Sequence, residues 1–191
     1  SLFWEASTTV TRPEAEWLQS RATRIGASEA PIICGVSRFQ SAFGLYHAKL
    51  SVRDGIEPAV DPERDELMYW GRSLEPVIVG RFEQVTHKAT FTEPKVTTHL
   101  WNGHPEIAAT LDAVTEGEGG HLVPREVKNV SAYLADEWMD QTPLYYQVQV
   151  QHQLLVTGAQ MGYLAALIGG NSFRWAAVRR DDAFIEKMLA A

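Results

Sequence analysis

The period of the hydrophobic pattern changes near residue 90, and this change restricts the possible folds more than any other feature of the sequence. Over residues 63–86 the apolar side chains recur every three or four positions, which predicts one long helix with a buried stripe. The stripe consists of Leu67, Trp70, Leu74, Ile78 and Phe82. Because a proline inside a helix removes a backbone donor, we expect a break or kink beside Gly71 or Pro76.

Beyond the long helix, the pattern becomes that of strands separated by helices. Strands are predicted over residues 91–101, 107–114, 121–130, 161–168 and 172–180. The turn between residues 114 and 121 contains three glycines, which favours a hairpin. Helices are predicted over residues 28–34, 41–50, 143–157 and 181–189, with Ser28 capping the first and a polar loop over residues 54–62. This order predicts an α/β fold with a central mixed β-sheet flanked by helices, and 191 residues suit a single domain over residues 1–191.

Composition excludes several classes of protein. A hydrophobic content of 45% and a charged content of 21% exclude a disordered, collagen-like or coiled-coil chain. Cys34 is the single cysteine, so no internal disulfide forms, and we expect a reducing cytoplasm, with this thiol buried and inert. No apolar run approaches the ~20 residues that span a membrane, and we expect no signal peptide. The six histidines are scattered without the spacing of a zinc site.

Two carboxylates and an ammonium group fall together on the predicted hairpin. Asp112 lies near the end of one strand, and Glu126 and Lys128 are two positions apart on the next, which puts them on one face. A divalent cation would relieve the repulsion between the carboxylates, and magnesium suits oxygen ligands that leave several waters in place. Lys128 would then either help to deprotonate a metal-held water or stabilise developing negative charge. The alternative is a surface hairpin with an ordinary Glu–Lys ion pair, and the net charge of -7 argues against a generic nucleic-acid coat.

Four blocks of residues also occur in a fixed order. They are residues 24–30 with Trp17 and Arg21 upstream, residues 70–71 with 74–76, residues 111–113 with 126–128, and residues 145–151 running on to 155–158 and 163–165. Over roughly residues 14–180 these blocks resemble the YqaJ-type viral recombinases. That family is the lambda-exonuclease-like branch of the PD-(D/E)XK nuclease superfamily, which implies a restriction-endonuclease-like core.

The resemblance implies a magnesium-dependent nuclease that trims linear double-stranded DNA from its 5′ ends and leaves a 3′ single-stranded overhang for recombination. Asp112, Glu126 and the backbone carbonyl of Val127 would bind the metal, with two ions and with manganese as a possible substitute. Lys128 would orient or activate the water, and Glu75 would reach the site from the long helix. Where family members usually have Pro-Asp-Gly, this chain has a leucine before Asp112 and Ala113 after it.

The resemblance also implies residues that contact DNA. Arg21 and Ser28 match positions that hold the 5′-terminal phosphate, a role that suits a guanidinium and a hydroxyl at a helix start. Their alternative reading is a surface arginine and a simple helix cap. Tyr146 and Gln149 would contact the substrate backbone beside the metal, or else be a buried aromatic and a polar surface residue. The glutamines of this block alternate as in a strand, but the family block predicts a helix.

The resemblance therefore implies a metal-dependent 5′-to-3′ exonuclease of phage or prophage origin that acts in the cytoplasm of a bacterial host. The resemblance further implies a homotrimeric ring around DNA, a single-strand annealing protein as partner, and no membrane. Two other functions stay open on the same fold. One is a structure- or sequence-specific endonuclease, and the other is a non-catalytic protein that binds DNA ends.

Overall fold

A five-stranded mixed sheet forms the centre of the molecule. The computed structural model describes residues 7–11, 13–56, 61–92, 97–139 and 141–191. The strands of the sheet, in spatial order, are β2 (Thr90–Phe91), β5 (Ala113–Glu116), β6 (Leu122–Val130), β7 (Met161–Ile168) and β8 (Ser172–Arg179). Only the β6–β7 pair is parallel among these strands, and the others are antiparallel. The predicted mixed sheet and the predicted hairpin, β5–β6, are confirmed, and the last two predicted strands, β7 and β8, form a second antiparallel pair.

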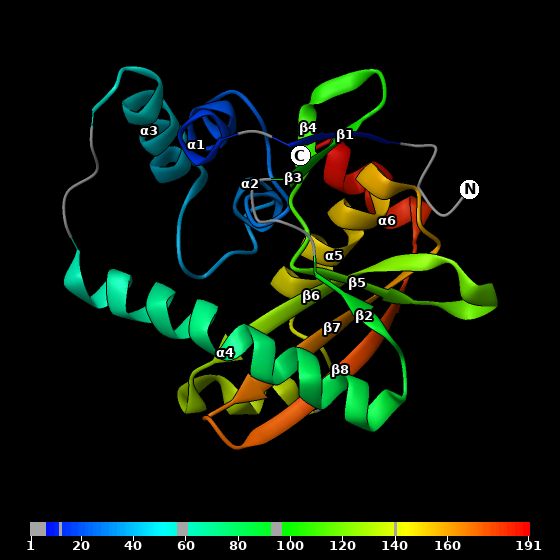
Figure 1. Cartoon of the computed structure of the whole chain (residues 1–191). Helices are drawn as coiled ribbons and strands as arrows, with labels where there is room; N and C mark the ends of the chain where they lie inside the picture. Colours follow the sequence, from blue (N-terminus) through cyan, green and yellow to red (C-terminus); the bar gives the residue numbers. More distant parts are fainter. Residues whose placement is uncertain (1–6, 12, 57–60, 93–96, 140) are drawn as a thin grey trace.

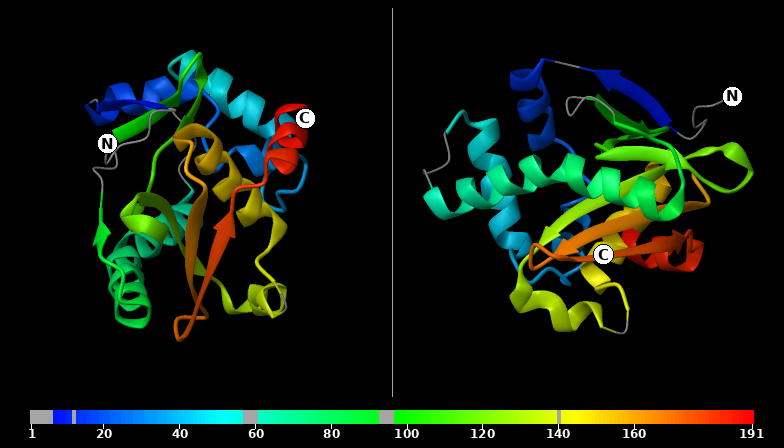
Figure 2. Two further views of the ribbon diagram at one scale, coloured as in Figure 1. Left: turned by 90° about the vertical axis from the view of Figure 1, so that its right-hand side faces the viewer. Right: turned by 60° about the horizontal axis from the view of Figure 1, so that its bottom comes forward.

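Two helices cover the opposite faces of this sheet (Figures 1 and 2). α4 (Pro62–Thr86) packs on one face, where the ring of Phe82 lies 5.3 Å from that of Tyr163 on β7. α5 (Leu144–Thr157) connects the parallel strands β6 and β7 and packs on the other face. A parallel pair needs such a crossover, because its strands start at the same edge of the sheet. α5 ends at Gly158, whose φ of 75° suits a residue without a side chain.

α4 differs from its prediction in two respects. It begins at its Asp61 cap and continues through Pro76 without the predicted break. Of the predicted stripe, Ile78 and Phe82 are buried, but Leu67 is 73% exposed and Trp70 is 47% exposed. A helix of 25 residues is about 37 Å long, whereas five strands span about 20 Å, so the N-terminal half extends beyond the sheet in Figure 1.

The structure has a second sheet, and two predicted strands are wrong because each of them runs from one sheet into the other. It consists of β1 (Ser7–Thr11), β3 (Thr97–Trp101) and β4 (His104–Ala109), paired in the order β1-β3-β4. The predicted strand over 91–101 is two strands in different sheets, and its residues 93–96 lie outside the described residues. The predicted strand over 107–114 likewise ends at Ala109, and β5 begins at Ala113 in the other sheet. Apolar runs alone do not reveal where a chain passes from one sheet to another.

The remaining helices lie at the margins of the central sheet. They are α1 (Glu14–Ala22), α2 (Ala30–Ile33), α3 (Ala42–Arg53), α6 (Asp182–Leu189) and the 3-10 segment η2 (Ala132–Trp138). Sequence reasoning missed β1, α1 and η2 as elements. It also placed the start of α2 too early, because Ser28 lies in an exposed turn and Glu29 occupies the cap position. The predicted loop over 54–62 lies partly outside the described residues, and Pro62 already belongs to α4.

Candidate active site

Asp112 and Glu126 come together at the start of the β5–β6 hairpin. Asp112 occupies the bend before β5, and Ala113 pairs with Arg125 on β6. This register brings the Asp112 carboxylate against β6, where its Oδ2 accepts a hydrogen bond of 3.0 Å from the backbone amide of Val127. Val127 itself is buried in the core, as its odd position on the strand predicts. The structure thus unites the two predicted carboxylates, although Asp112 lies between strands rather than within one.

Glu126 is a buried carboxylate held by three donors. Only 3% of the residue is exposed, on the face of β6 that α5 covers. Its Oε1 accepts from Gln149 Nε2 at 2.6 Å and lies 2.5 Å from Lys128 Nζ, and its Oε2 accepts from Gln153 Nε2 at 2.5 Å. Burial and the nearby charge of Asp112 nevertheless raise the pKa of Glu126 to about 7. The carboxylate is therefore fixed in position but lacks enough positive charge to stay fully ionised below neutral pH.

Lys128 remains an ammonium group in this environment. Burial alone would lower its pKa, but the charges of Glu126 and Asp112 outweigh burial and raise the pKa of Lys128 above its usual value. Its Nζ also lies 5.4 Å from the centroid of the Tyr146 ring. Burial raises the pKa of the Tyr146 phenol as well. The structure therefore brings Tyr146 and Gln149, both on α5, together with Lys128 and Glu126.

Gln153 is a member of this cluster that sequence reasoning missed. Its side chain is fully buried, and its amide nitrogen donates to Glu126. The signal was available, because Gln153 follows Gln149 by four residues and four-residue spacing places side chains on one helix face. Its Oε1 has no hydrogen-bond partner within the described part of the chain. Such a buried acceptor is the kind of atom that a bound water or ion would satisfy.

Arg125 links Glu75 to the site from the opposite face of β6. The Arg125 side chain is fully buried, stacks 4.6 Å from the Phe82 ring centroid and donates to Thr90 Oγ1 at 2.9 Å. Burial lowers its pKa to about 10, and the charges of Glu83, Asp112 and Glu75 oppose that shift. Glu75, half-buried on α4, therefore lies within electrostatic reach of the same cation as Asp112. Sequence reasoning did not single out Arg125.

The donor set fits a hard divalent cation. Asp112 and Glu126 supply carboxylate oxygens, and the repulsion between them is what a bound cation would remove. No cluster of three or more histidine, cysteine, aspartate or glutamate side chains suited to a metal occurs within the described ranges. Magnesium is a cation that binds through one or two carboxylates and retains several waters.

Two of the histidines and the cysteine, which were not predicted to bind a metal or to act as a nucleophile, are buried or half-buried. His152 is buried on α5, where burial lowers its pKa to about 4 and its Nε2 lies 2.9 Å from the carbonyl oxygen of Ala108. His99 is also buried, with its Nδ1 3.2 Å from Thr9 Oγ1. Cys34 is half-buried, and burial raises the pKa of its thiol, which disfavours a reactive thiolate.

Arg21 and Ser28 lie at the junction of α1 and α2. Arg21 is exposed in the last turn of α1, with its guanidinium 5.1 Å from the Trp17 ring centroid and its Nη2 4.0 Å from Glu29 Oε1. Ser28 is exposed in the turn directly before Glu29. The two side chains therefore flank one buried carboxylate. The predicted helix-cap geometry of Ser28 is wrong, because the helix begins at Ala30 and Glu29 Oε2 accepts from the Gly26 amide at 2.8 Å.

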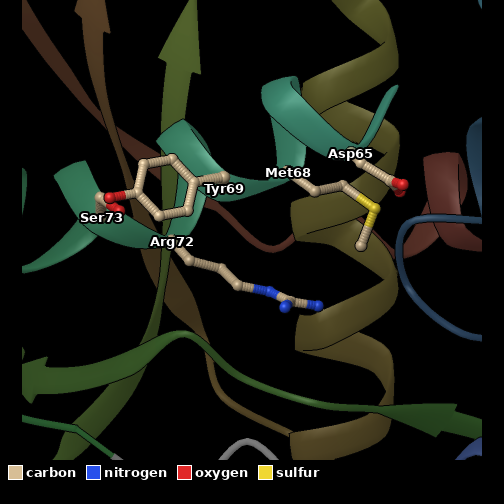
Figure 3. Close-up of a pocket in the computed structure, with 5 residues that line it drawn as sticks. All are labelled: Asp65, Met68, Tyr69, Arg72 and Ser73. Atoms are coloured by element: carbon tan, nitrogen blue, oxygen red, sulfur yellow. The ribbon is translucent and has the colours of Figure 1, made fainter. Parts of the chain in front are cut away.

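A hollow of about 480 Å³ lies along the exposed half of α4, before Glu75 in the chain (Figure 3). Its lining residues share one helical face: Asp65, Met68, Tyr69, Arg72 and Ser73. Figure 3 shows the Arg72 side chain extending from the α4 ribbon into this space. Arg72 is exposed.

Comparisons with known proteins agree with this geometry. Residues 16–160 match the YqaJ-like viral recombinase domain. The uncharacterized protein YqaJ of Bacillus subtilis (strain 168) is 35% identical over 182 residues, which cover 92% of this chain and 53% of that protein. The chain therefore spans about half the length of this relative.

Solved exonuclease structures share the fold. An alkaline exonuclease, LHK-Exo of Laribacter hongkongensis, matches with a TM-score of 0.69 and 17% identity over 92% of this chain and 87% of the other. Its complex with dAMP matches with a TM-score of 0.71 and 20% identity over the same shares. A phage-related exonuclease of Haemophilus somnus 129PT gives 0.59 and 11% identity over 87% and 88%. With the family match covering most of its residues, the chain belongs to the YqaJ-like viral recombinase domain family.

Proposed function

We propose that the protein is a magnesium-dependent nuclease that degrades linear double-stranded DNA from its 5′ ends and leaves 3′ single-stranded overhangs for recombination by strand annealing. The observation that carries this proposal is the buried Glu126 carboxylate, held between Lys128, Gln149 and Gln153 beside Asp112. Family membership and the fold shared with an alkaline exonuclease support the proposal. The structure of that enzyme with dAMP supports DNA as substrate.

Each residue of the cluster has a distinct role in phosphodiester hydrolysis. Asp112, Glu126 and the Val127 carbonyl would hold magnesium, most simply as two ions for which manganese can substitute, and a bound metal supplies an activated water and neutralises phosphate charge. Gln149 and Gln153 hold the two oxygens of Glu126 in position. Lys128 Nζ lies 2.5 Å from Glu126 Oε1, so this side chain would either help to deprotonate a metal-held water or stabilise negative charge on the phosphorane.

The remaining predicted residues act on the substrate. Glu75 adds negative charge that would help to retain the cation, since it lies near the same Arg125 as Asp112. Tyr146, beside Lys128, would contact the DNA backbone near the scissile bond. Arg21 and Ser28 would bind the 5′-terminal phosphate, because a guanidinium and a hydroxyl both donate to phosphate oxygens.

Assembly and partners are further parts of the proposal. The N-terminal half of α4 exposes Leu67, Tyr69 and Trp70, which would suit contacts between copies in a homotrimeric ring. The product overhang would be passed to a single-strand annealing protein in the cytoplasm of a bacterial host, in a phage or prophage context. Residues 1–191 would act as a single nuclease domain. No helix within the described residues is long and apolar enough to span a membrane.

One digestion experiment tests the nuclease and its end specificity together. A 5′-phosphorylated linear duplex and the same sequence as a closed circle are incubated with the protein and magnesium. We expect loss of the linear strand from its 5′ end and an intact circle. Asp112→Ala should reduce the rate by at least about 100-fold, because one of the two carboxylates that hold the metal is lost.

The alternatives predict different digestion patterns. Cleavage of the closed circle would favour a structure- or sequence-specific endonuclease on the same fold. Absence of cleavage with either magnesium or manganese would favour a non-catalytic protein that binds DNA ends, and it would exclude the proposed chemistry.

A further inference from the structure

Lys49 and Glu29 form an ion pair that is separate from the cluster around Glu126. Lys49 lies on α3, and its Nζ is 2.9 Å from Glu29 Oε2. Only 20% of the Lys49 side chain and 11% of the Glu29 side chain are exposed. A charged pair that is this deeply buried needs further hydrogen bonds to offset desolvation.

The Lys49 ammonium group uses all three of its donors on the protein. Besides Glu29, it donates to the carbonyl oxygen of Arg21 at 2.7 Å and to that of Arg24 at 2.6 Å. These carbonyls lie at and just beyond the C-terminal end of α1, where a cation is favourable. Lys49 therefore ties α3 to the end of the helix that carries Arg21, and it has no donor left for a ligand.

Glu29 completes the connection to the turn that carries Ser28. Its Oε2 also accepts from the amide of Gly26 at 2.8 Å, which closes the turn that ends at Glu29. Its Oε1 lies 4.0 Å from Arg21 Nη2. One carboxylate thus touches the Ser28 turn, the Arg21 guanidinium and the Lys49 ammonium group.

We infer that Lys49 and Glu29 are positioning residues for a 5′-phosphate site made by Arg21 and Ser28. Their ion pair fixes the distance between the end of α1 and the Ser28 turn, and Lys49 neutralises the Glu29 charge beside Arg21. Two cations and one carboxylate leave a net positive charge that attracts a phosphate. Loss of Lys49 would leave Arg21 paired with an uncompensated Glu29. This inference rests on the proposed contact of Arg21 and Ser28 with the 5′ phosphate.

The test is an equilibrium binding measurement in which no cleavage occurs. The full chain in EDTA is titrated onto one fluorescent linear duplex with either 5′-phosphate or 5′-hydroxyl ends. The Kd for the 5′-hydroxyl duplex divided by the Kd for the 5′-phosphate duplex gives the phosphate preference. Lys49→Met should lower this ratio by about tenfold, the value of one charge-assisted hydrogen bond. Lys49→Met combined with Glu29→Gln should recover part of it, because the uncompensated carboxylate is gone.

Two further variants control for folding and for general charge. Arg53→Met removes another cation of α3, in an exposed pair with Asp54, and should leave the ratio unchanged. Lys49→Arg keeps the charge but cannot reproduce the hydrogen bonds of the ammonium group to its three acceptors, so the Kd ratio should fall about threefold. This variant tests the inference even if Lys49→Met fails to fold. A wild-type ratio in any folded Lys49 variant, or no phosphate preference in the wild type, would overturn the inference. Absence of DNA digestion would instead count against the nuclease proposal, because the affinity ratio does not depend on cleavage.

Discussion

At the scale of single residues, Glu126 makes the stability of the protein depend on pH in an unusual direction. Its pKa is about 7 in the folded protein against 4.5 when unperturbed. Between these values the folded state holds more protons than the unfolded state, so stability falls as pH rises. The difference corresponds to about 3 kcal/mol. We expect Glu126→Gln to remove this loss in urea unfolding measured in EDTA at pH 5 and pH 8.

His152 also contributes to the pH dependence of stability, so the wild-type protein must be compared with Glu126→Gln. Its pKa is lowered to about 4, so it contributes the opposite slope and lowers stability as pH falls below about 6.5. Only the difference between wild type and variant isolates Glu126. If both proteins show the same pH dependence, Glu126 is not the titrating group. Magnesium or manganese should reverse the Glu126 contribution, because a bound cation favours the ionised carboxylate.

Gln153 provides a second prediction at this scale. Gln153→Leu replaces the glutamine with an apolar side chain of similar volume and leaves Glu126 Oε2 without the Gln153 donor. Outer partners of metal ligands are typically worth about 10- to 100-fold, so we expect that loss in apparent magnesium affinity or nuclease rate. The measurement is a magnesium titration of the digestion rate, with Gln151→Leu as the matched control. Gln151 is also buried on α5, but its amide donates to the Arg179 carbonyl, away from Glu126. Equal losses in both variants would contradict a specific role for Gln153.

The sequence predicted more of this site than of its surroundings. Glu126 and Lys128 follow from strand periodicity, and Tyr146 and Gln149 follow from the resemblance and helix spacing. Asp112 was expected near the end of a hairpin strand and lies in the bend before β5. Arg125 escaped notice because a charged residue on a strand is usually exposed, and only the packed structure reveals that α4 covers it. The Lys49–Glu29 pair was equally out of reach, since it joins residues 20 positions apart through tertiary packing.

At the scale of elements, the close approach of α5 to β7 positions the glutamines against Glu126. Gly162 lies on the β7 face under α5, where an added Cβ would meet the Pro124 carbonyl oxygen at 3.0 Å and Val150 Cγ1 at 3.3 Å. Gly162→Ala should therefore destabilise the protein by about 1–3 kcal/mol through overpacking. It should also lower nuclease activity more than stability alone explains, because α5 carries Gln149 and Gln153.

Gly80 on α4 provides the control for the Gly162 prediction. An added Cβ there meets no atom within 4 Å among the described residues, and the site is helical. Gly80→Ala should stabilise the protein by about 0.5–1 kcal/mol, or raise the Tm by about 1–4 °C. Thermal unfolding of both variants checks the opposite signs. A Gly162→Ala protein as stable as the wild type would mean that α5 can shift freely on the sheet.

Elements were predicted well where one sequence pattern meets one environment. α5 and the β7–β8 hairpin satisfy this condition, because most residues of α5 are buried and β7 and β8 pair along their whole lengths within one sheet. α4 does not, since its C-terminal half is packed and its N-terminal half is exposed, although the period of apolar residues is continuous. The segment from Ala109 to Ala113 fails for a related reason, because it connects two sheets that hydrophobic patterning cannot distinguish.

At the scale of the whole molecule, the exposed half of α4 is an unusual surface for an isolated chain. Leu67 is 73% exposed, Tyr69 60% and Trp70 47%, all within one turn and a half of a helix with no covering element among the described residues. Contiguous apolar exposure of this kind marks contact sites between proteins. Tyr69 also lines the hollow into which Arg72 extends.

Assembly through this helix yields the last prediction. If copies associate through α4, Leu67→Glu should shift the protein from the trimer toward the monomer in sedimentation velocity, because a buried carboxylate without a partner opposes association. Tyr133→Glu is the matched control, since Tyr133 is 97% exposed on η2 and lies on another element. It should leave the sedimentation coefficient unchanged. A wild-type protein that sediments as a monomer, or equal effects of both substitutions, would contradict assembly through α4 without affecting the chemistry proposed for Glu126.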